Sequence, residues 1–415
     1  MNKRLYVIAS ATILAGALSM GAVAVLQGGN GFSIRQSSET SSEKVTISLA
    51  DGTATATSDA VAIDGATVTI SQAGQYEVTG QAEGVQILVT DSVTEDVTIS
   101  LNNASLSSIA FSSTGLNTVE LIDGTVNSLS GAETGVTAPR LTVTGQGSLD
   151  IANVTTYGMF ASEELLIESG TITITSAGSG LYAKHETDAN QANVAINGGT
   201  VNIAAGQAEG ATGIFAGNNL TVNDGTITVS SAFEAYVGKH VVVNGGTANL
   251  TSIDDGIVSK DPFYIEGQES VVDITFNGGS TSIVATGDGV DSNGNLTVAG
   301  GTLVFTSPSQ DNAAMDYSGT ASLTGGTVWA VGASNMAQSF TTASQNYIMT
   351  TVYGVAGDTI TITDAAGNEI ATLTAPVEFS SVLFSTPELV AGEVYFVSTT
   401  SGSSGQATAA LEVLQ

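Results

Sequence analysis

Five aspartates fall in three short stretches of the second half of the chain, SIDDGIVSK, ATGDGVDSN and AAMDYSG. They are Asp254, Asp255, Asp288, Asp291 and Asp316. If the stretches stack as neighbouring coils, Asp255 lies over Asp288 and Asp291 over Asp316, about 5 Å apart. Carboxylates at that distance repel each other, whereas Ca²⁺ binds several oxygens at once. The spacing therefore predicts a Ca²⁺ site, and the alternative is that the Asp-Gly pairs only form turns.

Lys260 stands among these aspartates in a chain that has only eight Lys and Arg residues. Four of the six basic residues beyond position 24 follow the same predicted strand in different coils: Arg140, Lys184, Lys239 and Lys260. The two histidines, His185 and His240, lie at this edge too. Bases gathered along one edge suit sugars that carry carboxylates. Lys260 would meet a metal-bound uronate there, as a binding cation or as the base of a lyase.

The outward position of the same predicted strand is aromatic in four consecutive coils: Phe160, Tyr182, Phe215 and Tyr236. The preceding position is apolar throughout and is expected to point inward, so the next one must point outward. Exposed aromatics in a row mark an interaction surface, and their faces suit the C–H faces of sugar rings. With Lys184 and Lys239 they predict a polysaccharide-binding face. The alternative is a stack that packs only on itself or lies under the insertions at 186–195 and 261–273.

A glycine-containing corner recurs through the chain and defines the coils that would position these residues. The spacing runs from 21 residues (Gly225 to Gly246) to 33 residues (Gly246 to Gly279). The corner glycines are Gly124, Gly147, Gly170, Gly199, Gly225, Gly246, Gly279, Gly301 and Gly326. Polar and apolar residues alternate on both sides of each corner, as strands require, and a repeat of this length is typical of a solenoid. We therefore predict an all-β fold, a parallel β-helix over 61–344, with 345–415 as a β-strand cap over its open end.

The composition and the N-terminal segment limit which partners the protein can bind and in which compartment it acts. The 39 acidic and 8 basic residues give a formal charge of −31, which repels nucleic acid and anionic membranes. The absence of cysteine excludes disulfides and thiolate metal sites. Lys3 and Arg4 precede an uncharged stretch, so residues 1–24 are predicted to be a secretion signal or an N-terminal anchor, with the rest outside the cell. Residues 25–60 have the composition of a flexible linker.

The aspartate stretches, the sequence LTGGTVWAVG at 323–332 and the tail AGNEIATLTAP at 366–376 resemble a family of secreted bacterial carbohydrate-binding domain proteins. The resemblance covers about residues 61–400. It implies a right-handed parallel β-helix shaped like a pectate lyase, binding of cellulose and pectic acid, and bound calcium. The five aspartates match the calcium-carrying coils of that family.

These observations predict calcium-dependent binding of a plant cell-wall or other polysaccharide outside the cell, without catalysis. Two alternatives stay open. One is a calcium-dependent polysaccharide lyase in which Lys260 removes the proton beside a uronate carboxylate. The other is a purely structural surface rod or adhesin, which would have no affinity for sugars.

Overall fold

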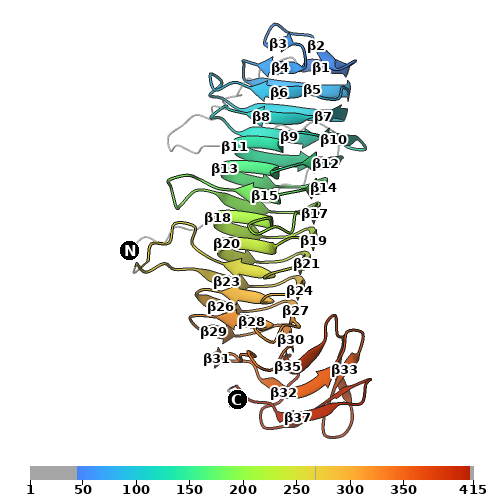
Figure 1. Cartoon of the computed structure of the whole chain (residues 1–415), viewed down its shortest axis with the longest axis vertical. Helices are drawn as coiled ribbons and strands as arrows, with labels where there is room; N and C mark the ends of the chain where they lie inside the picture. The colour runs from blue at the N-terminus through green and yellow to red at the C-terminus, as the bar shows by residue number, and fades with distance from the viewer. Residues whose placement is uncertain (1–43, 267, 412–415) are drawn as a thin grey trace, which may run out of the picture. The chain divides into compact units, whose positions relative to one another are not determined.

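Short strands follow one another around a stack of coils in the computed structural model, which describes residues 44–266 and 268–411 (Figure 1). Strands of successive coils pair in parallel, and they form three faces that we call A, B and C. The described residues contain no helix, and so none that could span a membrane. The predicted all-β parallel β-helix is therefore confirmed.

Face A carries the candidate site and consists of eleven strands that pair in sequence order. They are β4 (Thr67–Ile70), β6 (Gln86–Val89), β8 (Ser108–Phe111), β11 (Thr134–Gly145), β13 (Tyr157–Ile167), β15 (Ser179–Ala183), β18 (Thr212–Val222), β20 (Glu234–Val243), β22 (Ile257–Ser259), β25 (Val290–Ser292) and β28 (Met315–Tyr317). Because the pairing is parallel and mostly in register, equivalent residues of successive coils form columns along the solenoid.

Faces B and C complete each coil. Face B contains β1 (Val45–Ala50), β5 (Gly74–Gln81), β7 (Val97–Leu106), β9 (Asn117–Leu121), β16 (Asn193–Ile196), β23 (Asp273–Phe276), β26 (Asn295–Val298), β29 (Ala321–Leu323), β31 (Thr342–Ala343) and the later halves of β11, β13, β18 and β20. Face C contains β10 (Val126–Ser130), β12 (Ser148–Val154), β14 (Thr171–Ser176), β17 (Thr200–Ala204), β19 (Thr226–Ser231), β21 (Thr247–Ser252), β24 (Ser280–Ala285), β27 (Thr302–Ser307) and β30 (Thr327–Gly332).

Apolar columns fill the space between the faces. The inward column of face A is at most 1% exposed at every position, and its members are Val136, Met159, Leu181, Ile214, Tyr236, Ile257, Val290 and Met315. Successive side chains of a strand point to opposite faces, so residues beside this column point outward.

The recurring glycine corner joins face B to face C. Gly246 has a φ of +74°, a conformation that residues with a Cβ rarely adopt. A Cβ added there would lie 2.6 Å from the carbonyl oxygen of Gly225, the corner glycine of the preceding coil. Glycine recurs at this corner because the chain turns into the left-handed region and because successive corners touch.

An asparagine ladder runs beside these corners. The side-chain amides of Asn277, Asn244 and Asn223 each donate to the side-chain oxygen of the asparagine in the preceding coil, at 2.8, 2.7 and 2.8 Å. The last, Asn197, donates to Glu168 Oε1 at 3.0 Å. A carboxylate can only accept, so Glu168 sets the orientation of all four amides.

The first described coil begins earlier than the composition indicated. Residues 45–56 were predicted to belong to a linker, but β1 pairs in parallel with β5, and β2 (Thr53–Ala56) pairs with β1 as a hairpin. The reason is the alternation in Val45–Ala50, which buries Ile47 and Leu49. A second hairpin joins β3 (Val61–Asp64) to β4. The predicted signal or anchor at 1–24 lies outside the described residues.

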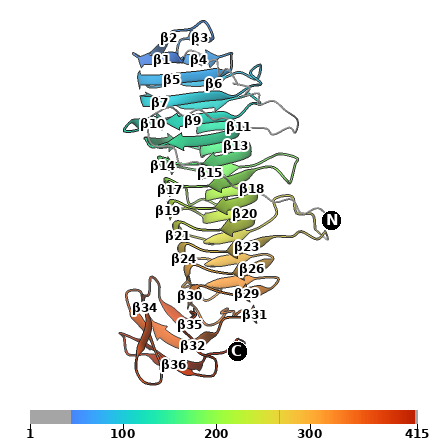
Figure 2. The same ribbon diagram turned by 180° about the vertical axis from the view of Figure 1, so that it is seen from behind.

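The C-terminal strands pack against the last coils (Figure 2). β35 (Phe379–Ser385) pairs antiparallel with both β30 and β32 (Tyr347–Gly354). A separate antiparallel sheet contains β33 (Thr359–Thr363), β34 (Glu369–Thr374), β36 (Val394–Thr399) and β37 (Ser404–Thr408). The two layers share a second hydrophobic core, which includes Ile348, Ile362 and Phe384. The antiparallel β35 thereby covers the edge of β30.

Candidate functional site

The outward column of face A changes from aromatic to acidic along the solenoid. In pairing order it reads Thr137, Phe160, Tyr182, Phe215, Val237, Val258, Asp291 and Asp316. The structure therefore places three of the four predicted aromatics and two of the five aspartates on one column.

Tyr236 is not part of this column, contrary to the sequence prediction. It pairs with Ile214 and is fully buried, while Val237 takes the place beside Phe215. Val237 and Val258 are themselves buried and pack with Phe215 and Tyr182. A shift of one residue moves a side chain to the opposite face of a strand, which accounts for the error.

The aromatic cluster contains one residue that the sequence analysis missed. Tyr157 opens the same strand as Phe160, and its ring lies 4.5 Å from that of Tyr182. The rings of Tyr182 and Phe215 stack at 4.4 Å with an angle of 12°. Burial raises the pKa of Tyr182 to about 12, and Phe215 is only 9% exposed. The partly exposed part of the cluster is thus formed by Tyr157, Phe160 and Tyr182.

A second column, at the corner where face C turns into face A, carries acidic residues. It contains Glu234, Asp255 and Asp288, each two residues before the inward column. Asp255 Oδ1 accepts the backbone N–H of Asp288 at 2.7 Å, and Asp288 Oδ1 accepts that of Ala313 at 2.5 Å. Each carboxylate thus uses one oxygen to bind the backbone of the next coil. Its second oxygen remains available to a ligand.

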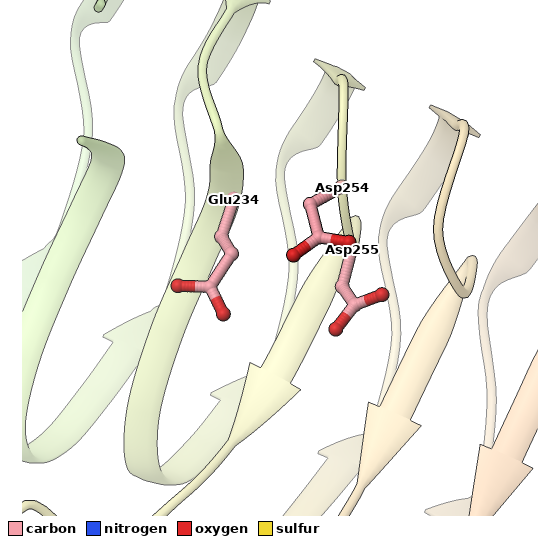
Figure 3. Close-up of side chains that lie close together, drawn as sticks. All are labelled: Glu234, Asp254 and Asp255. Carbon is pink, nitrogen blue, oxygen red and sulfur yellow. The ribbon is translucent and has the colours of Figure 1, made fainter. Parts of the chain in front are cut away.

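The acidic side chains form two groups that could hold a metal ion. Glu234, Asp254 and Asp255 offer oxygens within 4.8 Å of one another, with Glu234 on one coil and the two aspartates on the next (Figure 3). Asp288, Asp291 and Asp316 form the other group within the same distance. We call these six residues the acidic patch. Five of them are predicted from the sequence, whereas Glu234 is not, because an alignment one residue out of register hides its place in the column.

Burial makes the ionised form of this patch costly. It raises the pKa of Asp255 to about 7 and the pKa values of Asp288 and Asp291 to about 6. Neighbouring carboxylates add to the upward shift, whereas the backbone N–H donors oppose it for Asp255 and Asp288. Converging, partly buried carboxylate oxygens that lack matching cations are the donor set of a hard divalent ion such as Ca²⁺. The residues therefore fit a metal ion of this class.

Lys260 is the one base bonded to this patch among the described residues. Its ammonium lies 2.6 and 2.9 Å from the two oxygens of Glu234, whose side chain is 8% exposed. With six carboxylates and one ammonium, the patch carries −6 + 1 = −5 when all are ionised. One lysine therefore neutralises a small part of the charge.

The other bases along this edge are mostly held by acidic neighbours. Lys239 pairs with Asp261 at 2.9 Å, and His240 Nδ1 lies 2.8 Å from Asp273. Arg140 lies 3.7 Å from Glu163, and His185 accepts backbone N–H groups of its own loop. Lys184, by contrast, is exposed at the edge of face A. The spacing of these bases predicts their shared edge, but no sequence pattern indicates that Asp261, which follows Lys260, binds Lys239.

The sequence profile of a family described as carbohydrate-binding domain-containing proteins matches residues 64–311 and, in a second overlapping match, residues 207–370. The chain belongs to this family. The two matches include the aromatic cluster and the whole acidic patch.

A solved structure similar to this carbohydrate-binding family member is titled as the polysaccharide lyase-like protein from C. thermocellum, in a gadolinium derivative. The TM-score is 0.44 with 23% identity, and the alignment covers 62% of this chain and 97% of that one. No curated protein matches the chain.

Proposed function

We propose that this carbohydrate-binding domain protein binds a polysaccharide outside the cell along face A, with Ca²⁺ in the acidic patch. One observation carries the proposal: the aromatic cluster and two carboxylates of the acidic patch, those of Asp291 and Asp316, lie on the same outward column of face A. Four coil steps separate Tyr182, the last partly exposed ring, from Asp291, which is about 19 Å. A linear polymer that runs along the solenoid would meet both and would pass over the buried Phe215, Val237 and Val258 between them.

The two parts of the face would hold different groups of the polymer. The partly exposed rings of Tyr157, Phe160 and Tyr182 provide apolar surface for the C–H faces of sugar rings. Ca²⁺ in the acidic patch would supply the positive charge that attracts the carboxylates of an acidic polymer such as pectic polygalacturonate. Without a cation, the negatively charged patch repels such a polymer.

The Lys260 ion pair favours binding over catalysis. A general base needs a free lone pair, and an ammonium that is bonded to both oxygens of Glu234 offers none. The same ion pair joins the coil of β22 to the coil of β20, which gives Lys260 a role in stability.

Co-sedimentation with cellulose and with polygalacturonate gel tests the proposal, each in Ca²⁺ and in chelator. We expect Ca²⁺-dependent retention on the gel, reduced at least tenfold in Asp291→Asn/Asp316→Asn and retained in Asp150→Asn, which removes an exposed charge from face C. Release of unsaturated product from the gel would instead support the lyase alternative. A folded chain that stays in solution with both polymers would overturn the proposal in favour of a structural rod.

A further inference from the structure

A cleft of about 720 Å³ lies between the last coils and the C-terminal strands. One wall comes from the solenoid and includes Pro308, Gln310 and the segment 333–335, which follows β30. The other wall comes from the end of β32, the start of β35 and the turn between β36 and β37. None of the residues that line it belongs to the acidic patch or the aromatic cluster.

Hydrogen bonding joins the two walls, and further contacts fix the C-terminal wall itself. The backbone N–H of Ser334 donates to Ser380 Oγ at 2.8 Å, so the solenoid wall is bonded directly to the C-terminal wall. The N–H of Tyr353 donates to Ser403 Oγ at 3.0 Å. Gly354 lies against the ring of Phe379 so closely that an added Cβ would be 2.3 Å from it. The cleft is therefore formed by fixed groups, as expected of a ligand site that exists before binding.

The chemistry of the lining points to a neutral sugar. Tyr353 is 62% exposed, so its ring is available as a flat apolar surface. Asn335 contributes an exposed amide, which both donates and accepts hydrogen bonds as sugar hydroxyls do. In the described part of the chain, Glu378 is the one charged residue of the lining, and no base accompanies it. An anionic sugar would therefore meet repulsion without a compensating cation.

We propose that this cleft binds a neutral oligosaccharide, with the ring of Tyr353 under a sugar ring and Glu378 and Asn335 bonded to its hydroxyls. The volume lies within the range of pockets that enclose small ligands. The inference builds on the proposed function, because it gives the same polymer-binding protein a second site. It differs in requiring no metal ion, since the cleft holds one carboxylate rather than three.

The absence of cysteine from the chain allows a direct test. A single cysteine is introduced by Gln310→Cys at the exposed rim of the cleft, and the rate of its reaction with a maleimide is measured. A matched cysteine, Thr173→Cys, lies on an exposed position of β14 on face C. The probes are cellohexaose, mannohexaose and trigalacturonate, each with Ca²⁺ and with chelator.

We expect at least one neutral hexasaccharide to slow labelling at position 310 at least fivefold, with or without Ca²⁺, and to leave position 173 unchanged. Tyr353→Ala in the same background should abolish this protection, whereas Tyr353→Phe, which keeps the ring, should preserve it. Because Tyr353 is exposed, both variants should melt within a few degrees of the parent.

The outcomes separate this inference from the proposed function. A chain that sediments with a polymer but shows no protection at position 310 overturns the cleft site and leaves face A intact. Protection by trigalacturonate alone overturns the assignment to neutral sugars. Failure to sediment together with failure of protection overturns both proposals.

Discussion

The ammonium of Lys260 is bonded to both carboxylate oxygens of Glu234, at 2.6 and 2.9 Å, although five aspartates lie nearby. The pair connects the residue after β22 to the first residue of β20, so it crosses face A between neighbouring coils. Val237 and Val258, which lie between these positions on the outward column, are buried. The lysine thus satisfies the most buried carboxylate of the patch and leaves the aspartates for another cation.

Loss of the Lys260 ammonium should destabilise the fold. Lys260→Gln leaves the buried carboxylate of Glu234 without its partner, and we expect the free energy of unfolding to fall by about 1–3 kcal/mol in metal-free buffer. Urea denaturation measures it. Lys184→Gln removes an exposed lysine from the same edge and should change stability by less than about 0.5 kcal/mol. The double variant Lys260→Gln/Glu234→Gln should recover part of the loss, and equal effects at Lys184 and Lys260 would contradict the importance of the pair.

Calcium should stabilise the protein through the acidic patch. A ligand that binds only the folded state at 100 times its dissociation constant adds about 2.7 kcal/mol. We expect the melting temperature to rise with Ca²⁺ and to rise much less in Asp288→Asn/Asp291→Asn. Asp150→Asn should respond as the parent does. If Ca²⁺ raised the melting temperature of the double variant as much as that of the parent, the ion would bind elsewhere.

Without metal, stability should fall as the pH rises from about 4 to 7. Asp255, Asp288 and Asp291 have pKa values of about 7, 6 and 6 in the folded chain, above the ordinary 3.8. In that window the folded state binds more protons than the unfolded state, so each unit of pH lowers the free energy of unfolding. Melting temperatures at pH 5 and pH 7.5 in metal-free buffer measure the effect. Replacing all three aspartates by asparagine should flatten the profile, and a profile that stays equally steep would assign it to other groups.

Tyr236 should matter for folding and not for sugar binding. Its hydroxyl is buried and has no hydrogen-bond partner among the described residues. Tyr236→Phe should therefore leave the free energy of unfolding unchanged or raise it by about 1–3 kcal/mol. Tyr236→Ala should cost about 3–5 kcal/mol through the cavity it leaves. Urea midpoints and co-sedimentation check both. Weaker polymer binding by a folded Tyr236→Phe chain would contradict its inward position.

Tyr182 should show the opposite behaviour. Its ring joins Tyr157 and Phe215 in the aromatic cluster, and it is only partly exposed. Tyr182→Ala should lower retention on polysaccharide several-fold at a modest cost in stability, and Tyr182→Phe should retain most binding. The fraction that sediments against polymer concentration gives the comparison. Equal retention by the alanine variant would leave the cluster with a structural role alone.

Much of the fold follows from local pattern. The alternation of apolar residues and the corner glycines are properties of each coil alone, so they predict the parallel stack and its inward columns. The spacing within a coil does not fix the register of Tyr236. The inward residue follows its corner glycine by 11 positions at Tyr236 (236 − 225) and Ile257 (257 − 246), but by 15 at Ile214 (214 − 199). The pairing of Tyr236 with Ile214 in the preceding coil decides it.

The contacts between coils could not be predicted from the pattern of any single coil. Glu234 belongs to the acidic corner column, which becomes visible only in the correct register with Asp255. The partner of Lys239 lies in an insertion without repeat character, whose path is set by tertiary contacts such as the Asp261 ion pair. The C-terminal cleft depends on two walls that are far apart in sequence, and no local pattern of either wall indicates the other.

The asparagine ladder has a consequence for how such a chain can change over generations. Asn197, Asn223 and Asn244 each present the same amide to the coil before and the same oxygen to the coil after. If one whole coil is lost or copied, the two new neighbours meet through identical partners, and the row of bonds closes across the junction. A complete coil is therefore the smallest insertion or deletion that keeps this row of hydrogen bonds intact. Related proteins are expected to differ in length by whole coils.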